Sequence, residues 1–308
     1  MATTHPQATN SPPGSQSGRS HATAIALMCG AVTIFAMLDS AAKYLAQIAE
    51  VPVLQVIWVR FFIHALLIIA IFWPRGLSKV VISAKPGHQI TRSVLLAATT
   101  AFNFAAVKYL QLDQTVTIFF LAPLLVAALA GPILGEWVGW RRLLAIMTGF
   151  LGVLLVTKPG FGGIHWAVIY SFAATACYAL YGIHTRYMTG HDSAEVNLFY
   201  TAIAGAVLGA PLGLGVWVWP QDMLTWVLFG WMGLTGMAGH WLLILAYKYA
   251  PAPVVTPFVY AGLISMIFLG YMIFGDVPDI WTLAGGAVVV GSGLYLYFRE
   301  RSLESNQS

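Results

Sequence analysis

The chain has 308 residues, of which 59% are hydrophobic and only 8% are charged, and its mean hydropathy is +0.78. A soluble domain carries roughly 25% charged residues because its surface faces water, so this composition excludes an ordinary soluble protein and favours a protein that faces the bilayer. The formal net charge of +4 does not indicate nucleic-acid binding, because the basic residues stand in short loops, as in membrane proteins. Two cysteines, Cys29 and Cys177, provide neither a zinc site nor a disulfide framework.

Taken in chain order, residues 1–21 are rich in Pro, Ser, Gly, Gln and Thr and predict a disordered tail. Ten apolar segments follow, and a membrane span needs about 20 such residues. The segments are 22–46, 52–73, 92–109, 113–134, 142–157, 164–187, 195–217, 222–248, 251–274 and 279–298. Backbone amides in lipid must bond within their own segment. The predicted fold class is therefore an all-α membrane protein with ten transmembrane helices.

Basic residues are distributed unevenly between the two sides of this predicted bundle. With the N-terminus placed in the cytoplasm, eleven Lys and Arg fall on the cytoplasmic side, Lys43, Lys108 and Lys158 fall on the other, and Arg60 inside the second span completes the fifteen. Cytoplasmic loops of membrane proteins carry an excess of Lys and Arg. Both termini are thus predicted to be cytoplasmic, with 299–308 as a C-terminal tail.

The two halves of the chain share features at one offset. The pairs separated by 140 residues are Tyr109 with Tyr249, Gly135 with Gly275, and Glu136 with Asp276. Each Tyr precedes an apolar segment that contains proline, then a Gly-acid pair, then a glycine-rich final segment. This self-similarity predicts two copies of a five-helix unit. Because five is odd, the second copy is inverted, which is a recurrent construction of secondary transporters. A membrane scaffold that merely duplicated is the alternative interpretation.

Several short motifs occur in a characteristic order: Leu38-Asp39 before Lys43-Tyr44, Trp58-Val59-Arg60, Pro123 ahead of Leu134-Gly135-Glu136, Gly149 to Gly152, and Lys158-Pro159-Gly160. In their order and spacing the chain resembles the EamA-type branch of the drug/metabolite transporter superfamily over 22–298. The resemblance implies repeats at 22–158 and 159–298, a central cavity between them, and alternating access without ATP. It also implies a multi-pass protein of the bacterial inner membrane. Asp276 departs from the Glu usual at that place in the family.

The resemblance further implies a secondary transporter of a small organic metabolite. The first two spans look most like bacterial importers of vitamins or nucleoside-type metabolites, such as riboflavin or S-adenosylmethionine. Amino acids are also candidate substrates, and an exporter of amino acids or drugs is the alternative. A non-transporting scaffold is the candidate of a different class. An enzyme is not expected, because Asp39 is the only deeply placed aspartate and no zinc set or Walker A run is present. The expected partners are substrate and bilayer, with no cofactor, metal or nucleic acid. Coupling of transport to protons stays open, and so does the oligomeric state, which is a monomer or a homodimer.

Ionisable residues inside the spans are the first candidates for the site, because a charge in the bilayer is costly. Asp39 and Lys43 are four residues apart on one helix face, and so are Arg60 and His64. Counted at ~1.5 Å per residue, Asp39 and Arg60 lie at a matching depth, roughly 10–12 Å below the outer boundary. One interpretation is a structural ion pair of Asp39 with Arg60 or Lys43. The other is a polar wall of the substrate cavity.

His240 is the only charge-capable residue deep in the second half. One interpretation is that it binds a proton or a substrate group. The other is that it is a core residue whose hydrogen bonds are satisfied within the bundle. Aromatic side chains within the spans can stack on a planar heterocycle or pack against the core and lipid. The remaining candidates for substrate contact are Asn103, Tyr178, Tyr200 and Trp241. At a helix end near Arg141 and Arg142, we expect Glu136 to form an interfacial salt bridge that connects the fourth span to the fifth, and a role in gating is the alternative.

Overall fold

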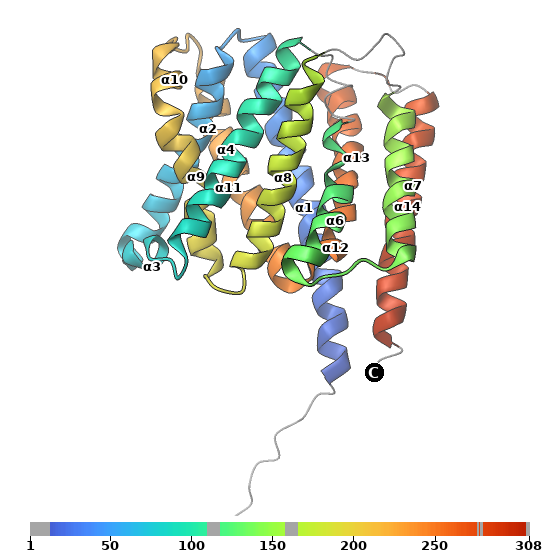
Figure 1. Ribbon diagram of the computed structural model, residues 1–308. Coiled ribbons are helices and arrows are strands. Elements are labelled where there is room, and N and C mark those ends of the chain that lie inside the picture. Colours follow the sequence, from blue (N-terminus) through green and yellow to red (C-terminus); the bar gives the residue numbers. More distant parts are fainter. Residues whose placement is uncertain (1–12, 110–117, 158–165, 276, 278–279, 306–308) are drawn as a thin grey trace, which may run out of the picture.

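The computed structural model describes residues 13–109, 118–157, 166–275, 277 and 280–305, and these residues form helices and turns without a strand. Long helices stand side by side in one bundle (Figure 1). The helices of the first half are α1 (Pro13–Gln47), α2 (Val53–Phe72), η1 (Trp73–Arg75), α3 (Ser78–Val81), α4 (Pro86–Tyr109), α6 (Ala122–Leu134) and α7 (Trp140–Thr157). Those of the second half are α8 (Val168–Met188), α9 (Ala194–Leu208), α10 (Ala210–Gly215), α11 (Met223–Tyr249), α12 (Ala252–Val255), η2 (Thr256–Tyr260), α13 (Ala261–Leu269), η3 (Gly270–Phe274) and α14 (Ile280–Ser305).

Within the described residues, each apolar segment of the sequence contains a helix or a run of short helices, which confirms the all-α membrane fold. Among the described residues, four helical stretches are long and apolar enough to cross a membrane by themselves: His21–Gln47, Val53–Arg75, Met223–Tyr249 and Ala252–Phe274. Shorter apolar helices stand beside them, so the count of ten spans stays a prediction. At its two ends the bundle is more helical than expected, because α1 begins at Pro13 and α14 continues to Ser305.

The segment predicted as the ninth span is a broken helix. It starts as α12, tightens into the 3-10 helix η2, continues as α13 and ends in the π-helix η3. Pro257 stands inside η2, and proline lacks the amide hydrogen that an α-helix needs at that place. The break turns Val259 and Tyr260 toward the bundle interior, where both are buried.

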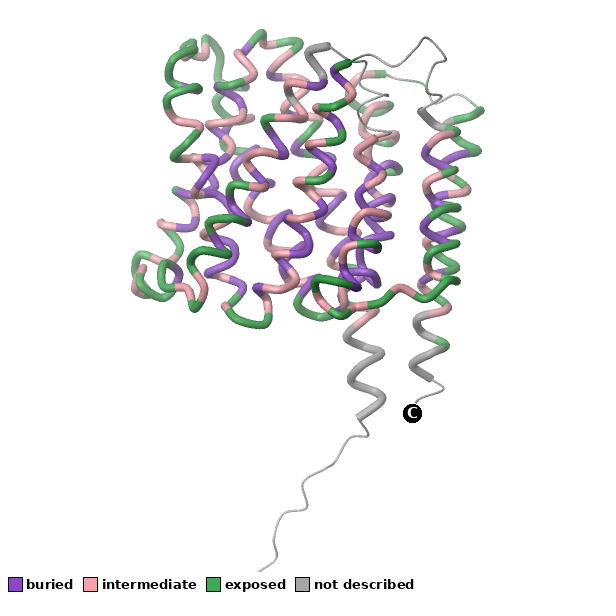
Figure 2. The backbone as a smooth tube through the Cα atoms, viewed as in Figure 1, coloured by how far each residue is buried: buried purple, intermediate pink, exposed green. Residues whose placement is uncertain are grey.

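The outer faces of the bundle are apolar. Large apolar side chains such as Ile169 (67% exposed), Phe268 (60%) and Leu151 (55%) point away from the other helices. Buried residues concentrate on the inner faces of the helices (Figure 2). An apolar outer surface of this kind is unfavourable in water and suits lipid, in agreement with a multi-pass membrane protein.

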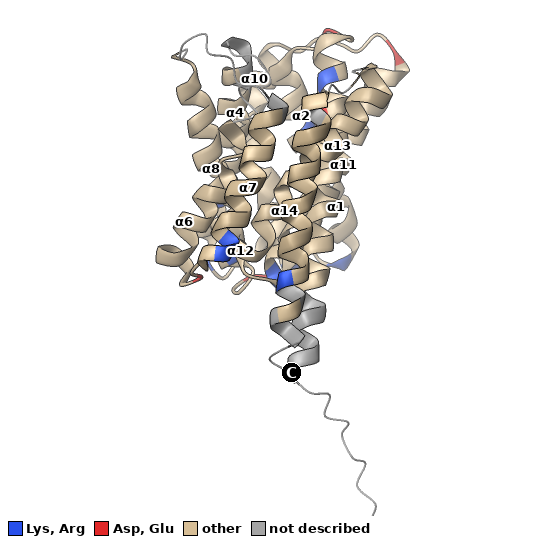
Figure 3. Ribbon diagram, turned by 90° about the vertical axis from the view of Figure 1, so that its right-hand side faces the viewer, with Lys and Arg blue, Asp and Glu red and all other residues tan. Residues whose placement is uncertain are grey.

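The two ends of the bundle differ in their content of basic residues. The described part of α1 begins, and that of α14 ends, at the same end, which we call the termini end, and the opposite end is called the far end (Figure 1). Most Lys and Arg segments lie toward the termini end (Figure 3). Arg75, Lys79 and Lys85 stand in the connection between α2 and α4 at that end. The bias agrees with the charge asymmetry of the sequence.

The pairs of helices that pack together are the same in both halves once each helix is replaced by its counterpart in the other half. At the 140-residue offset α1 corresponds to α8 and α4 to α11, and the structure packs α1 against α11 and α4 against α8. Likewise α2 packs on its counterpart α9, and α7 on its counterpart α14. Gly135 and Gly275 also match: both end a helix in the left-handed conformation, with φ of 73° and 72°. Glycine adopts this conformation without the penalty of a Cβ atom.

Candidate functional site

An internal cavity of about 220 Å³ lies where the two halves meet. Its wall comes from α1, α2 and α4 in the first half and from α8, α11, η2 and α13 in the second, together with Phe119 and Phe120 ahead of α6. Most of the wall is apolar or aromatic. The polar side chains that line it are Asp39, Arg60, Thr99, Thr100, Asn103, Tyr178 and His240. An apolar cavity with a few converging polar groups is the usual form of a small-molecule site.

Arg60 and His240 contact each other in this wall, although they are 180 residues apart. Arg60 Nη2 lies 3.3 Å from His240 Nε2. Arginine has only donors, so His240 accepts through Nε2 and carries its own proton on Nδ1. That Nδ1–H then donates to the Tyr181 hydroxyl 3.0 Å away. His240 is therefore a neutral residue that fixes the orientation of a cavity-lining guanidinium.

Asp39 lines the same cavity in a different environment. It is exposed to the cavity rather than packed against neighbours, and no hydrogen bond or ion pair to another described residue holds it. Asp39 and Arg60 attract each other electrostatically, but no ion pair connects them in the described part of the chain. Phe35, one helical turn earlier, lies on the same face of α1 and also lines the cavity. The ion-pair interpretation of Asp39 with Arg60 is thus not the arrangement seen here.

His64 lies behind the cavity wall, one turn from Arg60. Its ring is parallel to that of His240, with centroids 6.2 Å apart and 19° between the planes. It is 1% exposed, and its Nε2 has no hydrogen-bond partner among the described residues. His64 is therefore a neighbour of the site and not part of the lining.

Asn103 and Tyr178 line the cavity as the sequence predicted. Below Asn103 on α4, the Thr99 and Thr100 hydroxyls donate to the backbone oxygens of Leu95 and Leu96 at 2.8 and 3.1 Å, so their hydrogens are already used. The Tyr178 ring packs against Phe119, with centroids 4.9 Å apart. These two aromatic rings belong to the apolar part of the wall.

Three further candidates lie outside the cavity. The Lys43 ammonium lies 4.1 Å above the Phe274 ring, nearer the far end. The Tyr200 hydroxyl donates to the Val81 backbone oxygen at 2.9 Å and so connects α9 to α3. Trp241 packs in a separate apolar cluster with Ile68 and Ile244. Their position indicates structural roles in this conformation.

Arg92 is a polar residue of the interior that the sequence did not single out. It is 0% exposed, although it stands at the end of a predicted span, where a basic residue can reach water. Its guanidinium donates to side chains of Gln89, Thr185 and Thr201 and to the backbone oxygen of Asn197, and it lies 5.5 Å from the Tyr181 ring. The available signal was its place at the first residue of the span 92–109. Arg92 thus connects α4 to α8 and α9 by hydrogen bonds. It lies between the cavity and the termini end.

Asp192 closes the same network at the surface, in the turn between α8 and α9. Burial by itself would raise the pKa of Asp192, but hydrogen bonds from the side chains of Gln89 and Ser83 and from the Ala84 amide outweigh burial, so this pKa lies below its ordinary value. Those donors favour the ionised carboxylate. The network therefore extends from Asp192 through Gln89 and Arg92 to Tyr181, which contacts His240.

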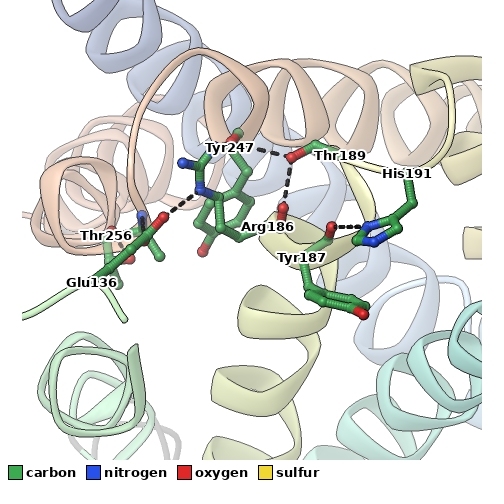
Figure 4. Close-up of polar contacts among 8 residues, drawn as sticks. Glu136, Arg186, Tyr187, Thr189, His191, Tyr247 and Thr256 are labelled. Atoms are coloured by element: carbon green, nitrogen blue, oxygen red, sulfur yellow. Dashed lines mark hydrogen bonds and ion pairs between the residues drawn. The ribbon is translucent and has the colours of Figure 1, made fainter. Parts of the chain in front are cut away.

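Glu136 forms a second polar cluster at the termini end (Figure 4). Its carboxylate accepts from Arg186 Nε at 2.7 Å and from the Ala252 amide at 2.8 Å. Arg186 also donates through Nη1 to the Tyr247 backbone oxygen at 2.7 Å. The predicted bridge from Glu136 to Arg141 or Arg142 is wrong, because α8 brings Arg186 to the carboxylate. The ion pair connects the end of α6 to three elements of the second half.

The chain is similar to known proteins in family, in sequence and in fold. A sequence-family model, described as "EamA-like transporter family", matches residues 22–158 and again 165–299. An S-adenosylmethionine uptake transporter of Rickettsia prowazekii is 23% identical, over 87% of this chain and 90% of the relative. A riboflavin transporter of Vibrio cholerae is 25% identical, over 85% of this chain and 88% of the relative. A solved crystal structure shares the fold, with a TM-score of 0.74 and 20% identity over 94% of this chain and 99% of the other.

Proposed function

The chain belongs to the EamA-like transporter family, and we propose that it is a secondary transporter that carries a small organic metabolite through the cavity between its halves. It is a multi-pass membrane protein and a transporter rather than an enzyme. The observation that carries the proposal is the cavity itself: Arg60, Asp39 and His240 converge there from α2, α1 and α11 inside an otherwise apolar wall. Ionisable groups inside a membrane protein mark substrate or ion pathways.

Alternating access is the proposed mechanism, and the distribution of polar contacts supports it. The Arg92 network and the Glu136–Arg186 ion pair both lie between the cavity and the termini end. The cavity-lining residues Asp39, Ala42 and Val56 instead lie near the helix ends that face the far end. This conformation is thus closed at the termini end. Transport requires the two polar clusters to open while the far end closes.

The proposed repeats are 22–158 and 159–298, the second inverted relative to the first. Two separate matches of one family model support the duplication. The exchanged packing pairs support the inversion, since α1 and α8 run in opposite directions through the bundle (Figure 1). We place both termini in the cytoplasm of a bacterial cell and the bundle in its inner membrane, because the basic residues gather at the termini end.

The substrate class follows from the size and polarity of the wall. A volume of about 220 Å³ is below the about 300–1,000 Å³ of typical ligand sites, so a larger substrate requires the halves to separate. Multiple phosphate groups would need more fixed positive charge than Arg60 supplies. We propose a planar metabolite that stacks on Tyr178 and Phe119, within the range of riboflavin, S-adenosylmethionine and amino acids.

Uptake by proteoliposomes containing the full chain tests the proposal. Labelled riboflavin, S-adenosylmethionine and aromatic amino acids are supplied in turn, with efflux measured from preloaded vesicles to determine direction. Arg60→Leu should abolish transport, and the exposed Arg75→Leu should not. The double variant Asp39→Leu with Arg60→Leu should fold but should not transport, and transport by this double variant would show that the charges are only structural. A scaffold would neither transport any of these compounds nor be thermally stabilised by them.

A further inference from the structure

Asp39 and Arg60 are an acid and a base that share one cavity without neutralising each other directly. Both line the wall, and no ion pair connects them among the described residues. Two opposite charges in an apolar enclosure would ordinarily be expected to pair, because each is costly to leave alone. Both side chains face one cavity without an ion pair between them, so a single ligand in that cavity can contact both.

Arg60 is held in place by contacts that leave donors for a ligand. Its Nη2 is used by His240, and its Cζ lies 4.9 Å from the Phe61 ring. The other hydrogen bonds of the guanidinium are not made by described residues, although it has five N–H groups. Because His240 is fixed in turn by Tyr181, the orientation of Arg60 is set before a ligand arrives. A preorganised guanidinium is well suited to a carboxylate.

Asp39 has the complementary properties. Its carboxylate is exposed to the cavity and has only acceptors when ionised. The wall around it includes Phe35, Leu38 and Ala42, which donate nothing. A cationic group of the ligand is therefore the partner that this carboxylate lacks.

We propose that the cavity binds a zwitterionic metabolite, with its carboxylate on Arg60 and its ammonium or sulfonium group on Asp39. This inference rests on the proposed function and names the charge class of its substrate. The apolar remainder of the ligand packs against Tyr178 and Phe119. A neutral ligand leaves both charges without a partner, an anion leaves Asp39 without one, and a cation leaves Arg60 without one. Only a zwitterion satisfies both.

Binding to the purified full chain tests the charge class. The probes are L-tryptophan and S-adenosylmethionine, each with its carboxamide and its N-acetyl derivative, and riboflavin as the neutral probe. The variants are Asp39→Asn and Arg60→Gln, with Lys43→Gln as the control one turn from Asp39 and outside the cavity. Affinity is measured by calorimetry, and thermal stabilisation is measured in parallel.

In the unmodified protein, the two carboxamides and N-acetyl-L-tryptophan should each bind about tenfold or more weakly than the parent compound, since a charge-assisted hydrogen bond is lost. N-acetyl-S-adenosylmethionine keeps its sulfonium group for Asp39 and should therefore lose less affinity. Arg60→Gln should remove the preference for the carboxylate over the carboxamide and keep the preference for the free amine. Asp39→Asn should do the reverse, and Lys43→Gln should change neither. If a variant does not fold, the capped derivatives still decide the question on the unmodified protein.

Two results would overturn the inference in different ways. Riboflavin binding without binding of either zwitterion would refute the charge class and leave the transporter function standing. Binding of none of the probes, together with no uptake, would refute both. Equal affinity of the zwitterions and their capped forms would also refute the charge class.

Discussion

Replacing Glu136 with Gln should open the termini end of the bundle. The substitution keeps the size of the side chain and removes its charge. In the structure Glu136 connects the end of α6 to Arg186 of α8 and to the Ala252 amide at the start of α12. Those contacts cross from the first half to the second. Under alternating access they can exist only in the conformation that is closed at this end.

The size of the effect follows from how far the pair is buried. An exposed ion pair contributes about 0–1 kcal/mol, whereas removing one partner of a fully buried pair costs about 3–5 kcal/mol. The Arg186 and Glu136 side chains are 25% and 17% exposed, which places the pair between these limits. Gln can still accept one hydrogen bond. We expect Glu136→Gln to cost the closed conformation about 1–2 kcal/mol, a change of about 5- to 30-fold in the conformational equilibrium.

Cysteine labelling measures that shift. Val255 in α12 is 0% exposed and lies three residues from the Ala252 amide that Glu136 holds. In a background without Cys29 and Cys177, Val255→Cys should react with impermeant maleimide in inside-out vesicles about 5 to 30 times faster when Glu136→Gln is present. Glu195→Gln, at the same end in the first turn of α9, is the control. An unchanged labelling rate with Glu136→Gln, despite lower thermal stability, would refute the role in closure and leave a purely structural one.

Three further predictions concern other parts of the chain. Arg92→Met should lower the free energy of unfolding by about 1–3 kcal/mol, since buried acceptors lose their donor. The exposed Arg75→Met should change it by less than about 0.5 kcal/mol, and equal losses in a denaturant titration would contradict the buried network. At a pH above 3.8, the ordinary Asp pKa, Asp192→Asn should lower the free energy of unfolding. This loss of stability should disappear as the pH falls through the lower pKa of the folded state. A loss of stability that grows in acid would contradict a lowered pKa of Asp192. A cysteine at Gln221 should be labelled by impermeant maleimide from outside intact cells, and one at Lys79 only after permeabilisation; the reverse pattern would invert the proposed topology.

Local sequence was sufficient for the class of fold. Long apolar segments interrupted by short polar loops can satisfy their backbone in lipid only as helices, and the structure has a helix at each segment. Charged residues within those segments were recognisable as candidates, because burial of a charge needs a reason. Asp39, Arg60 and His240 were found in this way. Asn103 and Tyr178 also line the cavity, while His64, Lys43, Tyr200 and Trp241 do not.

The partners of those residues came only from the tertiary structure. Matching depth suggested that Asp39 pairs with Arg60, but helix rotation directs Arg60 to His240 instead. Proximity along the chain suggested that Glu136 pairs with Arg141 or Arg142, but α8 supplies Arg186.

The sequence by itself therefore determined that the chain is a helical membrane protein, where its helices lie, and which ionisable groups are buried among apolar residues. It could not determine which of these groups meet, nor that Arg92, at the start of a predicted span, is buried. The physical reason is that hydropathy and helical period are local properties of the chain. Contacts between helices depend on the rotation, tilt and packing of elements more than a hundred residues apart.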